Sequence, residues 1–521
     1  MQALHARASL GFVRPVRVYG LTRTSRVRAL FLRGLGLVYF SAFTSLRAQV
    51  LGLVGRRGIA PARELLAAAH DALGSRSLHA YPSVFWFGVS DRALLRACRA
   101  GQGLSLVLVC GRAPRSTIFG LWLLYLSFVS VGGELLSYQW DTLLLETSVH
   151  ALVVASPRST RLFGREREDP SWQDLLLMRA LAWRFFYEAG IAKLRSGDPA
   201  WRDLSACSYH YETQPLPTPL SWMAHRLPPR VQRVSTLATL GIECIAPFAA
   251  FAPRRFRRAG FVALASLQTA IALTGNYGFF NMLSIVLALW LLDDAALPRL
   301  RALERKDRAP RRAGTFERVV STAGLIALLT ADTGVHLLRY GTRKPPRALT
   351  RLVGWLLPLR STGAYGLFSV MTRRRPEIVI EGSADGVRWL PYELPYKPGD
   401  PARRARWVAP HQPRLDWQMW FAAYDLPPDW FVRLVTRLLE GAPEVEALFE
   451  KCPFAGRRPR YIRAELYEYR MADRETVRRT GAHWTRRLLG DYLPPVALAA
   501  RRRGSEGRGA DRQPVDHIGI E

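Results

Sequence analysis

The residues best placed to do chemistry are charged side chains that interrupt long apolar stretches. Lys193 and Glu188 are the pair of most interest, because a lysine removed from water can lose its proton and act as a base. That hypothesis gives an integral membrane enzyme with Lys193 as its base. A lysine at this depth can equally extend to the membrane surface and stay charged, and the sequence leaves both alternatives open. The charged residues inside apolar stretches are Arg47, Glu146, Arg179, Arg184, Glu188, Glu243 and Asp332.

Two pairs of polar residues are spaced four apart and therefore share a helix face. Glu146 and His150 offer two ligands to a metal ion, but a metal site needs further ligands within reach, so we predict no metal and no cofactor. Arg184 and Glu188 have the same spacing, and we expect them to form an ion pair.

A histidine and an aspartate lie close together in a proline-flanked segment, at His411 and Asp416. Such a pair is typical of nucleophilic catalysis, yet the chain has no Gly-x-Ser-x-Gly elbow, so no catalytic residue is predicted here. We expect Asp416 to cap the helix that starts nearby or to pair with Arg414. The aromatic residues that follow share one helix face, suited either to core packing or to gripping a non-native polypeptide. They are Trp417, Trp420, Phe421 and Tyr424.

Most of the intramembrane candidates sit in apolar stretches of about the 17–25 residues that cross a bilayer. Nine such stretches precede residue 339, and none lies beyond residue 371. They are 34–54, 94–110, 116–131, 141–156, 173–194, 234–252, 259–274, 277–292 and 319–338. A poorer candidate at 352–371 is broken by Pro358 and Arg360. We therefore predict an α-helical polytopic membrane domain of about nine spans over residues 34–338.

Lysine and arginine counts orient these spans, because cytoplasmic loops carry an excess of both. If residues 1–33 are a basic cytoplasmic N-terminus, the segments on that side hold 24 Lys and Arg in 71 residues. The segments on the opposite side hold 10 in 92. With nine spans, the C-terminal part lies outside the cytoplasm.

Composition excludes several classes of protein. The chain has 521 residues and a formal net charge of +32, but only five of its 74 basic residues are lysines. That skew indicates a GC-rich, bacterial coding sequence, so the positive charge does not indicate nucleic acid, and we predict no nucleic acid partner. The apolar stretches predict the lipid bilayer as a partner. Five cysteines without a CxxC pair exclude a disulfide scaffold and a zinc–thiolate site. In the predicted topology Cys207 and Cys452 both lie outside the cytoplasm, so a disulfide bond between them is an alternative that the sequence leaves undecided.

From residue 375 the pattern becomes that of a water-soluble domain. Alternating residues at 377–381 and 387–394 flank Ser383-Ala384-Asp385-Gly386, which predicts a β-hairpin. Three helices and a further strand are predicted at 415–424, 428–440, 443–451 and 460–469. We therefore expect a soluble α+β C-terminal domain with a β-sandwich-like sheet. Its bounds are 375–500, between a connecting segment at 339–374 and a disordered tail at 501–521.

Several runs of polar, aromatic and glycine residues stand out. Three adjoin predicted spans: Tyr138–Glu146, Gly197–Pro215 and Gly275–Asn281. Two lie in the soluble part: Ile380–Trp389 and Tyr396–Ala423. In these runs the chain resembles the lipase maturation factor family, over roughly residues 30–495. One departure is Ala364, where the family pattern has an asparagine before Tyr-Gly.

The resemblance implies a membrane-embedded maturation factor. Vertebrate members are multipass proteins of the endoplasmic reticulum that help secreted lipases fold, with the C-terminal domain in the lumen. The equivalent site in a bacterium is the inner membrane, with the C-terminal domain in the periplasm. The implied partner is an exported client protein such as a lipase, bound without covalent chemistry.

The motif residues fall on the outer face in the predicted topology, and we predict that they form one client-binding surface. The alternative is that they are packing turns between helices. The residues are Gln139, Trp140, Asp141, Glu146, Asp198, Trp201, His210, Tyr211, Glu212, Gln214, Asn276, Asn281, Lys397, His411, Gln412, Arg414, Asp416, Trp417 and Trp420.

A second, more distant resemblance concerns the run Phe186–Leu194, which contains both Glu188 and Lys193. This run is similar to the membrane region of vitamin K-dependent gamma-glutamyl carboxylase. The resemblance keeps the enzyme alternative, with Lys193 as base, beside the maturation factor.

Overall fold

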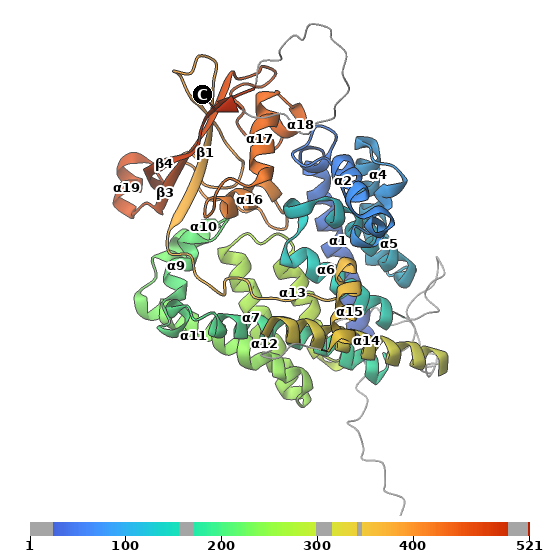
Figure 1. Ribbon diagram of the computed structural model, residues 1–521. Coiled ribbons are helices and arrows are strands. Elements are labelled where there is room, and N and C mark those ends of the chain that lie inside the picture. The colour runs from blue at the N-terminus through green and yellow to red at the C-terminus, as the bar shows by residue number, and fades with distance from the viewer. Residues whose placement is uncertain (1–23, 156–169, 298–314, 341–345, 499–518, 521) are drawn as a thin grey trace, which may run out of the picture.

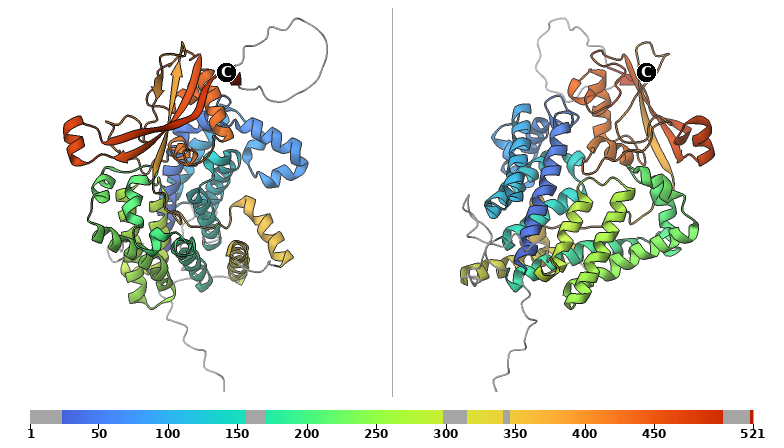
Figure 2. Two further views of the ribbon diagram at one scale, coloured as in Figure 1. Left: turned by 60° about the vertical axis from the view of Figure 1, so that its left-hand side comes forward. Right: turned by 180° about the vertical axis from the view of Figure 1, so that it is seen from behind.

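The computed structural model describes residues 24–155, 170–297, 315–340, 346–498 and 519–520. Its larger part is a bundle of helices, and a small sheet with short helices lies at one end of that bundle (Figures 1 and 2). Several predicted segments lie outside the described residues. They are the first 23 residues, the loops 157–169 and 299–312, and the tail 501–518.

Each of the nine apolar stretches is mostly helical. The helices are α1 (Ser25–Val54), α4 (Asp91–Val109), α5 (Pro114–Val131), α6 (Gln139–Val154), α7 (Trp172–Arg195), α11 (Pro229–Ile245), α12 (Arg254–Thr274), α13 (Phe280–Ala288) and α14 (Thr315–Tyr340). Three helical segments in the described residues are long and apolar enough to cross a membrane: Ser25–Val54, Pro114–Val131 and Pro229–Phe251. The transmembrane character is therefore confirmed, whereas the predicted number of about nine spans is not.

Length and charge explain why fewer spans qualify. Helices α6 and α13 have 16 and 9 residues, fewer than the roughly 20 that a span needs. Helix α7 is long enough, but it carries charged residues, of which Arg184 and Glu188 are buried inside the bundle.

Shorter helices connect the long ones. They are α2 (Ala62–Leu73), α3 (Ser77–Ala80), α8 (Pro199–Arg202), α9 (Ala206–Thr213), α10 (Pro219–His225) and α15 (Arg347–Leu356). The tenth candidate span is not a single helix, because α15 is followed by a 3-10 turn at Leu357–Leu359 and then by irregular chain up to the sheet.

The C-terminal domain contains one antiparallel sheet in the order β2-β1-β3-β4-β5. Its strands are β1 (Arg375–Ser383), β2 (Leu390–Tyr392), β3 (Tyr461–Met471), β4 (Trp484–Ala497) and β5 (Gly519–Ile520). The predicted hairpin is confirmed, since Ile380 of β1 pairs with Tyr392 of β2. Its turn uses Gly386 at φ +79°, a conformation that glycine adopts without strain.

The predicted β-sandwich is wrong, because the described residues form a single sheet and helices take the place of a second one. These helices are α16 (Arg414–Ala422), α17 (Asp429–Leu439), α18 (Pro443–Glu446) and α19 (Arg474–Thr480). Helix α17 turns Phe431, Leu434 and Leu438 into the core, and each is fully buried. An apolar helix stripe of this kind covers a sheet face as a second sheet would.

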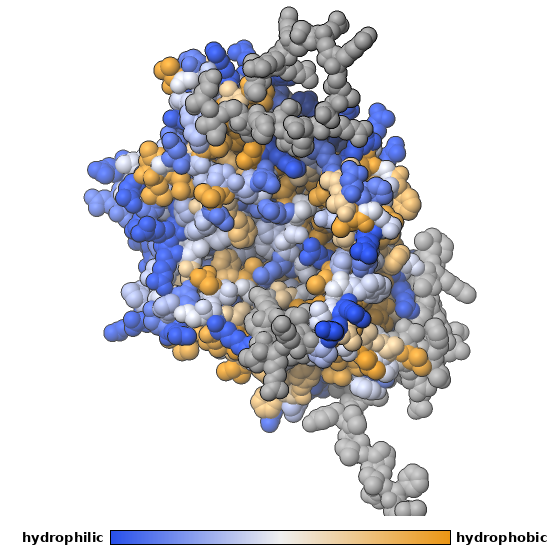
Figure 3. Space-filling model, viewed as in Figure 1, coloured by the Kyte–Doolittle hydropathy of each residue, from blue (hydrophilic) through white to orange (hydrophobic). Residues whose placement is uncertain are grey.

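Apolar side chains remain exposed on several helices far from the sheet. Figure 3 shows hydrophobic residues along the lower edge of the molecule, over α12 and α14. On α11 and α12, Val234, Leu237 and Val262 are 65, 57 and 60% exposed. Such surface is costly in water and is stable against lipid tails, in agreement with a membrane-embedded bundle.

Helix α1 is the central element of the bundle, and its closest partner is α4. The two backbones approach where Gly101 of α4 faces the ring of Phe43 on α1: a Cβ atom at Gly101 would lie 2.5 Å from that ring. Only glycine fits this position without moving a fully buried phenylalanine.

We expect Gly101→Ala to destabilise the bundle by about 1–3 kcal/mol, through overpacking against Phe43. The matched control is Gly103→Ala on the same helix, where no atom lies within 4 Å of the new methyl group. That change should be neutral or stabilise by up to about 1 kcal/mol, because alanine is the better helix former. Thermal unfolding in detergent measures both, and equal midpoints for the two variants would contradict the packing.

Candidate functional site

The strongest contact between the two parts is an ion pair between Arg414 of α16 and Asp141 of α6. The guanidinium donates to both carboxylate oxygens, at 2.5 and 2.7 Å, and the two side chains are 3 and 0% exposed. The Tyr125 hydroxyl donates to the same carboxylate at 2.5 Å. The prediction that Arg414 pairs with Asp416 is wrong, because residues two apart on a helix point in different directions.

The backbone before α16 is held by helix α1. The Gln412 amide donates to the Ser45 hydroxyl at 2.8 Å, and the Arg414 amide donates to the Gln49 side chain at 2.9 Å. In return, the Gln49 amide group donates to the Gln412 carbonyl at 2.7 Å. Ser45 and Gln49 were not among the predicted site residues, although two polar residues four apart inside an apolar stretch indicate a shared partner.

Aromatic rings fill the space beside the ion pair. The Trp417 ring lies 4.8 Å from that of Trp140 and 5.7 Å from that of Tyr277, measured between ring centroids. Tyr138 stacks on Trp140 at 4.4 Å. The neighbouring Gln139 accepts a hydrogen bond from the Gly366 amide at 3.1 Å.

The Gly275–Asn281 run receives the extended segment that leads to α16. The Asn276 side chain accepts hydrogen bonds from the amides of Val408 and Ala409 at 2.8 and 3.1 Å. It also donates to the Arg406 carbonyl at 2.8 Å. Gly278, at φ +58°, leaves room for Gln412, whose side-chain oxygen would lie 1.9 Å from a Cβ atom there. Asn281 instead bonds Gln268 within the helical bundle, at 2.9 Å.

The first half of the Gly197–Pro215 run holds the connecting segment. The Asp198 carboxylate accepts from the Met371 amide at 2.6 Å and from the Arg373 guanidinium at 3.2 Å. These bonds lower the pKa of Asp198, although its partial burial opposes them. The Trp201 ring nitrogen donates to the Phe368 carbonyl at 3.1 Å.

The second half of that run meets the sheet. Arg375, at the start of β1, donates to the carbonyls of Glu212 and Pro215, both at 2.8 Å. Trp420 of α16 donates to the Thr213 carbonyl at 2.8 Å. The Glu212 side chain accepts from the Met471 amide at 2.7 Å.

His210, Tyr211 and Gln214 lie on the bundle side of this contact. The Tyr277 hydroxyl donates to the Gln214 side-chain oxygen at 2.9 Å and lies 3.2 Å from the His210 ring nitrogen. Burial lowers the pKa of His210 to about 4, with a contribution from the charge of Lys193. Tyr211 is half-buried beside Cys207 of the same helix, α9.

Asp416 and Lys397 are buried within the C-terminal domain. One Asp416 oxygen accepts the amides of Tyr396 and Lys397 at 2.9 and 2.8 Å, so this carboxylate holds a loop and neither caps α16 nor binds Arg414. Burial raises the pKa of Asp416 to about 6, against the lowering effect of these amides. The Lys397 ammonium lies 2.9 Å from the carboxylate of Glu377.

His411 does not face Asp416. Its ring lies 5.6 Å from the Tyr396 ring, between centroids. Burial, followed by the charge of Arg414, lowers the pKa of His411 to about 4. The geometry therefore provides no histidine–aspartate pair at this segment.

Lys193 and Glu188 do not share a site. The Lys193 ammonium lies 2.7 Å from the Glu243 carboxylate, and both side chains are 7% exposed. Glu188 accepts the Tyr365 amide at 3.0 Å and lies 3.9 Å from Arg184, as the spacing of four predicted. Lys193 therefore pairs with Glu243 and does not lie beside Glu188.

The cysteines and the aromatic stripe are also placed. All five cysteines are free, so the bridge between Cys207 and Cys452 is not formed. Trp417 and Trp420 are buried in the core, whereas three neighbouring side chains are exposed. They are Phe421, Tyr424 and Leu426, at 43, 42 and 82%.

Comparison with known proteins agrees with this arrangement. A sequence model of the lipase maturation factor transmembrane domain matches residues 26–299, and one of the lipase maturation factor C-terminal domain matches residues 361–494. The chain belongs to the lipase maturation factor family. The contacts above thus join the two family domains to each other.

Named relatives extend along most of the chain. Lipase maturation factor 2 of Homo sapiens is 33% identical, over 90% of this chain and 82% of its own length. Lipase maturation factor 1 of Bos taurus is 34% identical, over 90% and 89%. No solved structure gives a significant match.

We expect Arg414→Met and Asp141→Leu each to destabilise the chain by about 3–5 kcal/mol, because each strands one buried charge. The double variant should lose less than either single one, since it buries no charge. Arg406→Gln is the control, because its pair with Glu450 is exposed and worth at most about 1 kcal/mol. Denaturation in detergent measures the free energy of unfolding of each variant. A double variant that loses the sum of the two single losses would argue against the pair.

His411 predicts a pH dependence. Its folded pKa of about 4 lies below the usual value of about 6.5, so its contribution is present above pH 6.5 and lost as the pH falls through 4. His411→Gln should reduce the fall of the free energy of unfolding over that window, by at most about 3 kcal/mol. His70→Gln, at an exposed position on α2, controls for loss of a histidine. An unchanged slope in the His411 variant would refute the assignment.

Proposed function

We propose that the protein is a multi-pass membrane maturation factor that helps an exported client, such as a lipase, to fold by transient, non-covalent binding. The observation that carries the proposal is the similarity to lipase maturation factors 1 and 2, at 33–34% identity over 90% of the chain. We place the protein in the bacterial inner membrane, with its C-terminal domain in the periplasm. The arginine bias of the predicted loops supports this orientation.

The burial of the motif residues refines where a client binds. The Asp141 and Arg414 side chains bond each other across the two parts, and the Gln412 backbone bonds Ser45 and Gln49, so these residues position the C-terminal domain. Client binding falls instead to exposed apolar side chains at the end of α16, namely Phe421, Tyr424 and Leu426. Exposed apolar groups bind unfolded chains because burial against a client removes both surfaces from water.

The ion pair between Lys193 and Glu243 argues against the enzyme alternative. A catalytic base needs its reacting atom turned toward a substrate, whereas the Lys193 Nζ atom lies 2.7 Å from the Glu243 carboxylate and donates to the Ala189 carbonyl at 3.0 Å. Binding without catalysis is therefore the function that the site geometry supports best.

We expect deletion of the gene to reduce the activity of at least one secreted enzyme without reducing its transcript. Complementation with a Phe421→Ser/Leu426→Ser variant should restore that activity roughly tenfold less well than the wild-type chain, as expected for loss of two apolar contacts. Activity assays and quantitative proteomics of the culture medium provide the readout.

The matched control is Val387→Ser in the β1–β2 turn. It removes an apolar side chain that is 83% exposed, close to the 82% of Leu426. Full rescue by that variant and poor rescue by the double variant would support the α16 surface. A deletion strain whose secreted proteome and enzyme activities equal those of the wild type would refute the proposed function.

A further inference from the structure

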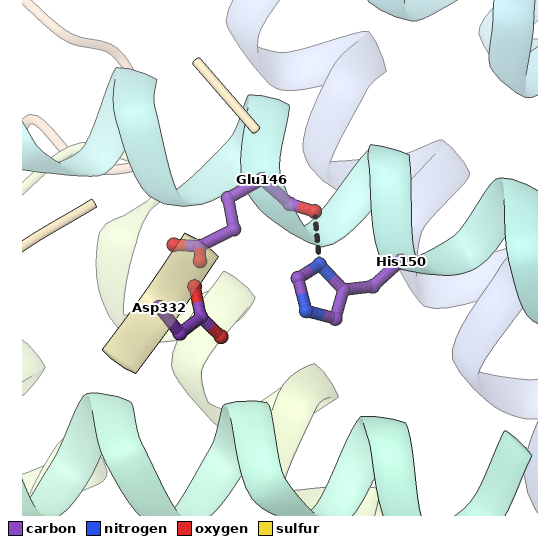
Figure 4. A group of neighbouring side chains, drawn as sticks. All are labelled: Glu146, His150 and Asp332. Atoms are coloured by element: carbon purple, nitrogen blue, oxygen red, sulfur yellow. Dashed lines mark hydrogen bonds between the residues drawn. The ribbon is translucent and has the colours of Figure 1, made fainter. Parts of the chain in front are cut away.

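Three ligand-type side chains meet inside the helical bundle, at a place separate from the ion pair between Arg414 and Asp141. They are Glu146 and His150 of α6 and Asp332 of α14. One ligand atom of each lies within 4.8 Å of the others, and all three residues are buried. Figure 4 shows the two carboxylates turned toward each other and the His150 ring beside them. The sequence pairs Glu146 with His150, whereas Asp332 joins them only through the fold.

The His150 ring is set for ligation. Its Nδ1 atom lies 2.9 Å from the Glu146 backbone carbonyl, drawn as the dashed line in Figure 4. A carbonyl only accepts, so Nδ1 carries the proton and Nε2 presents a lone pair. Nε2 has no hydrogen-bond partner among the described residues, although His150 is fully buried. A backbone carbonyl that fixes the tautomer in this way is common behind histidine ligands of metals.

The carboxylates are also held by donors from outside the cluster. Tyr365 and Arg184 donate to Glu146. Thr362 donates to Asp332 at 2.6 Å, and the Arg184 guanidinium lies 3.4 Å from the same carboxylate. These bonds orient the two acids and leave further oxygen lone pairs for a ligand.

Charge at the cluster is not balanced by these partners. Among the described residues, Arg184 is the cation that forms ion pairs with Glu146 and Asp332. Arg184 also pairs with Glu188, so three carboxylates share this one guanidinium in a buried site, beside an imidazole lone pair. Such an arrangement is costly unless a cation joins it.

We propose that Glu146, His150 and Asp332 bind a divalent transition-metal ion that ties α6 to α14. One imidazole and two carboxylates suit Zn²⁺, Mn²⁺ or Fe²⁺, whereas Ca²⁺ and Mg²⁺ prefer sites made of oxygen alone. The ion has a structural role: it supplies the charge that the cluster lacks and fixes α14 against the bundle. The proposal does not depend on the client or on the orientation in the membrane.

The test uses the full chain in detergent, purified through a tag that contains no histidine. We expect elemental analysis to find about one Zn²⁺ or Mn²⁺ per chain after growth with both metals. His150→Gln and Asp332→Asn should each reduce this content at least about tenfold, while His70→Gln, at an exposed position, retains it.

A second measurement follows metal binding by the purified chain directly. Wild-type protein is stripped with a chelator and titrated with Co²⁺, whose visible absorption reports on a nitrogen- and oxygen-ligated site. We expect a saturating band, together with a rise in the unfolding midpoint that the His150→Gln variant lacks. Absence of Co²⁺ binding by the stripped wild-type chain, or equal binding by the His150→Gln variant, would overturn the proposal and assign the cluster to a shared proton.

Discussion

The ion pair between Arg414 and Asp141 is the constraint on which the rest of the arrangement depends. Neither charge reaches water, so each is stable only while its partner and the Tyr125 hydroxyl replace the lost solvent. The arginine belongs to the C-terminal domain, and the other two groups belong to α6 and α5. Separation of the two parts would leave charges stranded in an apolar interface, and the chain therefore behaves as one folded unit.

That constraint separates the polar runs that join the two parts from the surface that we propose for client binding. Residues such as Asn276 and Asp198 use their side chains to hold the backbone of the C-terminal domain and its connecting segment. They fix where α16 sits and which of its faces stays exposed. In the proposed function, the C-terminal domain is a platform at one end of a membrane bundle, with apolar groups such as Leu426 exposed on its rim.

Features that are local in the sequence were predictable, and long-range partners were not. Apolar stretches gave the helices, and the Asp385-Gly386 turn gave the hairpin, because both signals lie within a few residues. Arg414 contacts a residue 273 positions away, and no spacing rule reaches that far. The long strand β4 was missed because most of its side chains are exposed, so it lacks an alternating pattern. The resemblance pointed to the motif residues, but only the fold showed that most of them are buried.

The most direct test of the central claim is hydrogen exchange of the backbone amides of Ala409, Gln412 and Arg414 in the full chain. Their hydrogen-bond acceptors are the side chains of Asn276, Ser45 and Gln49, which belong to the helical bundle and not to the C-terminal domain. The account predicts slow exchange of these amides, as slow as that of the strands of the sheet. Exchange as fast as that of an exposed loop would show that the two parts are not docked, and would contradict the account.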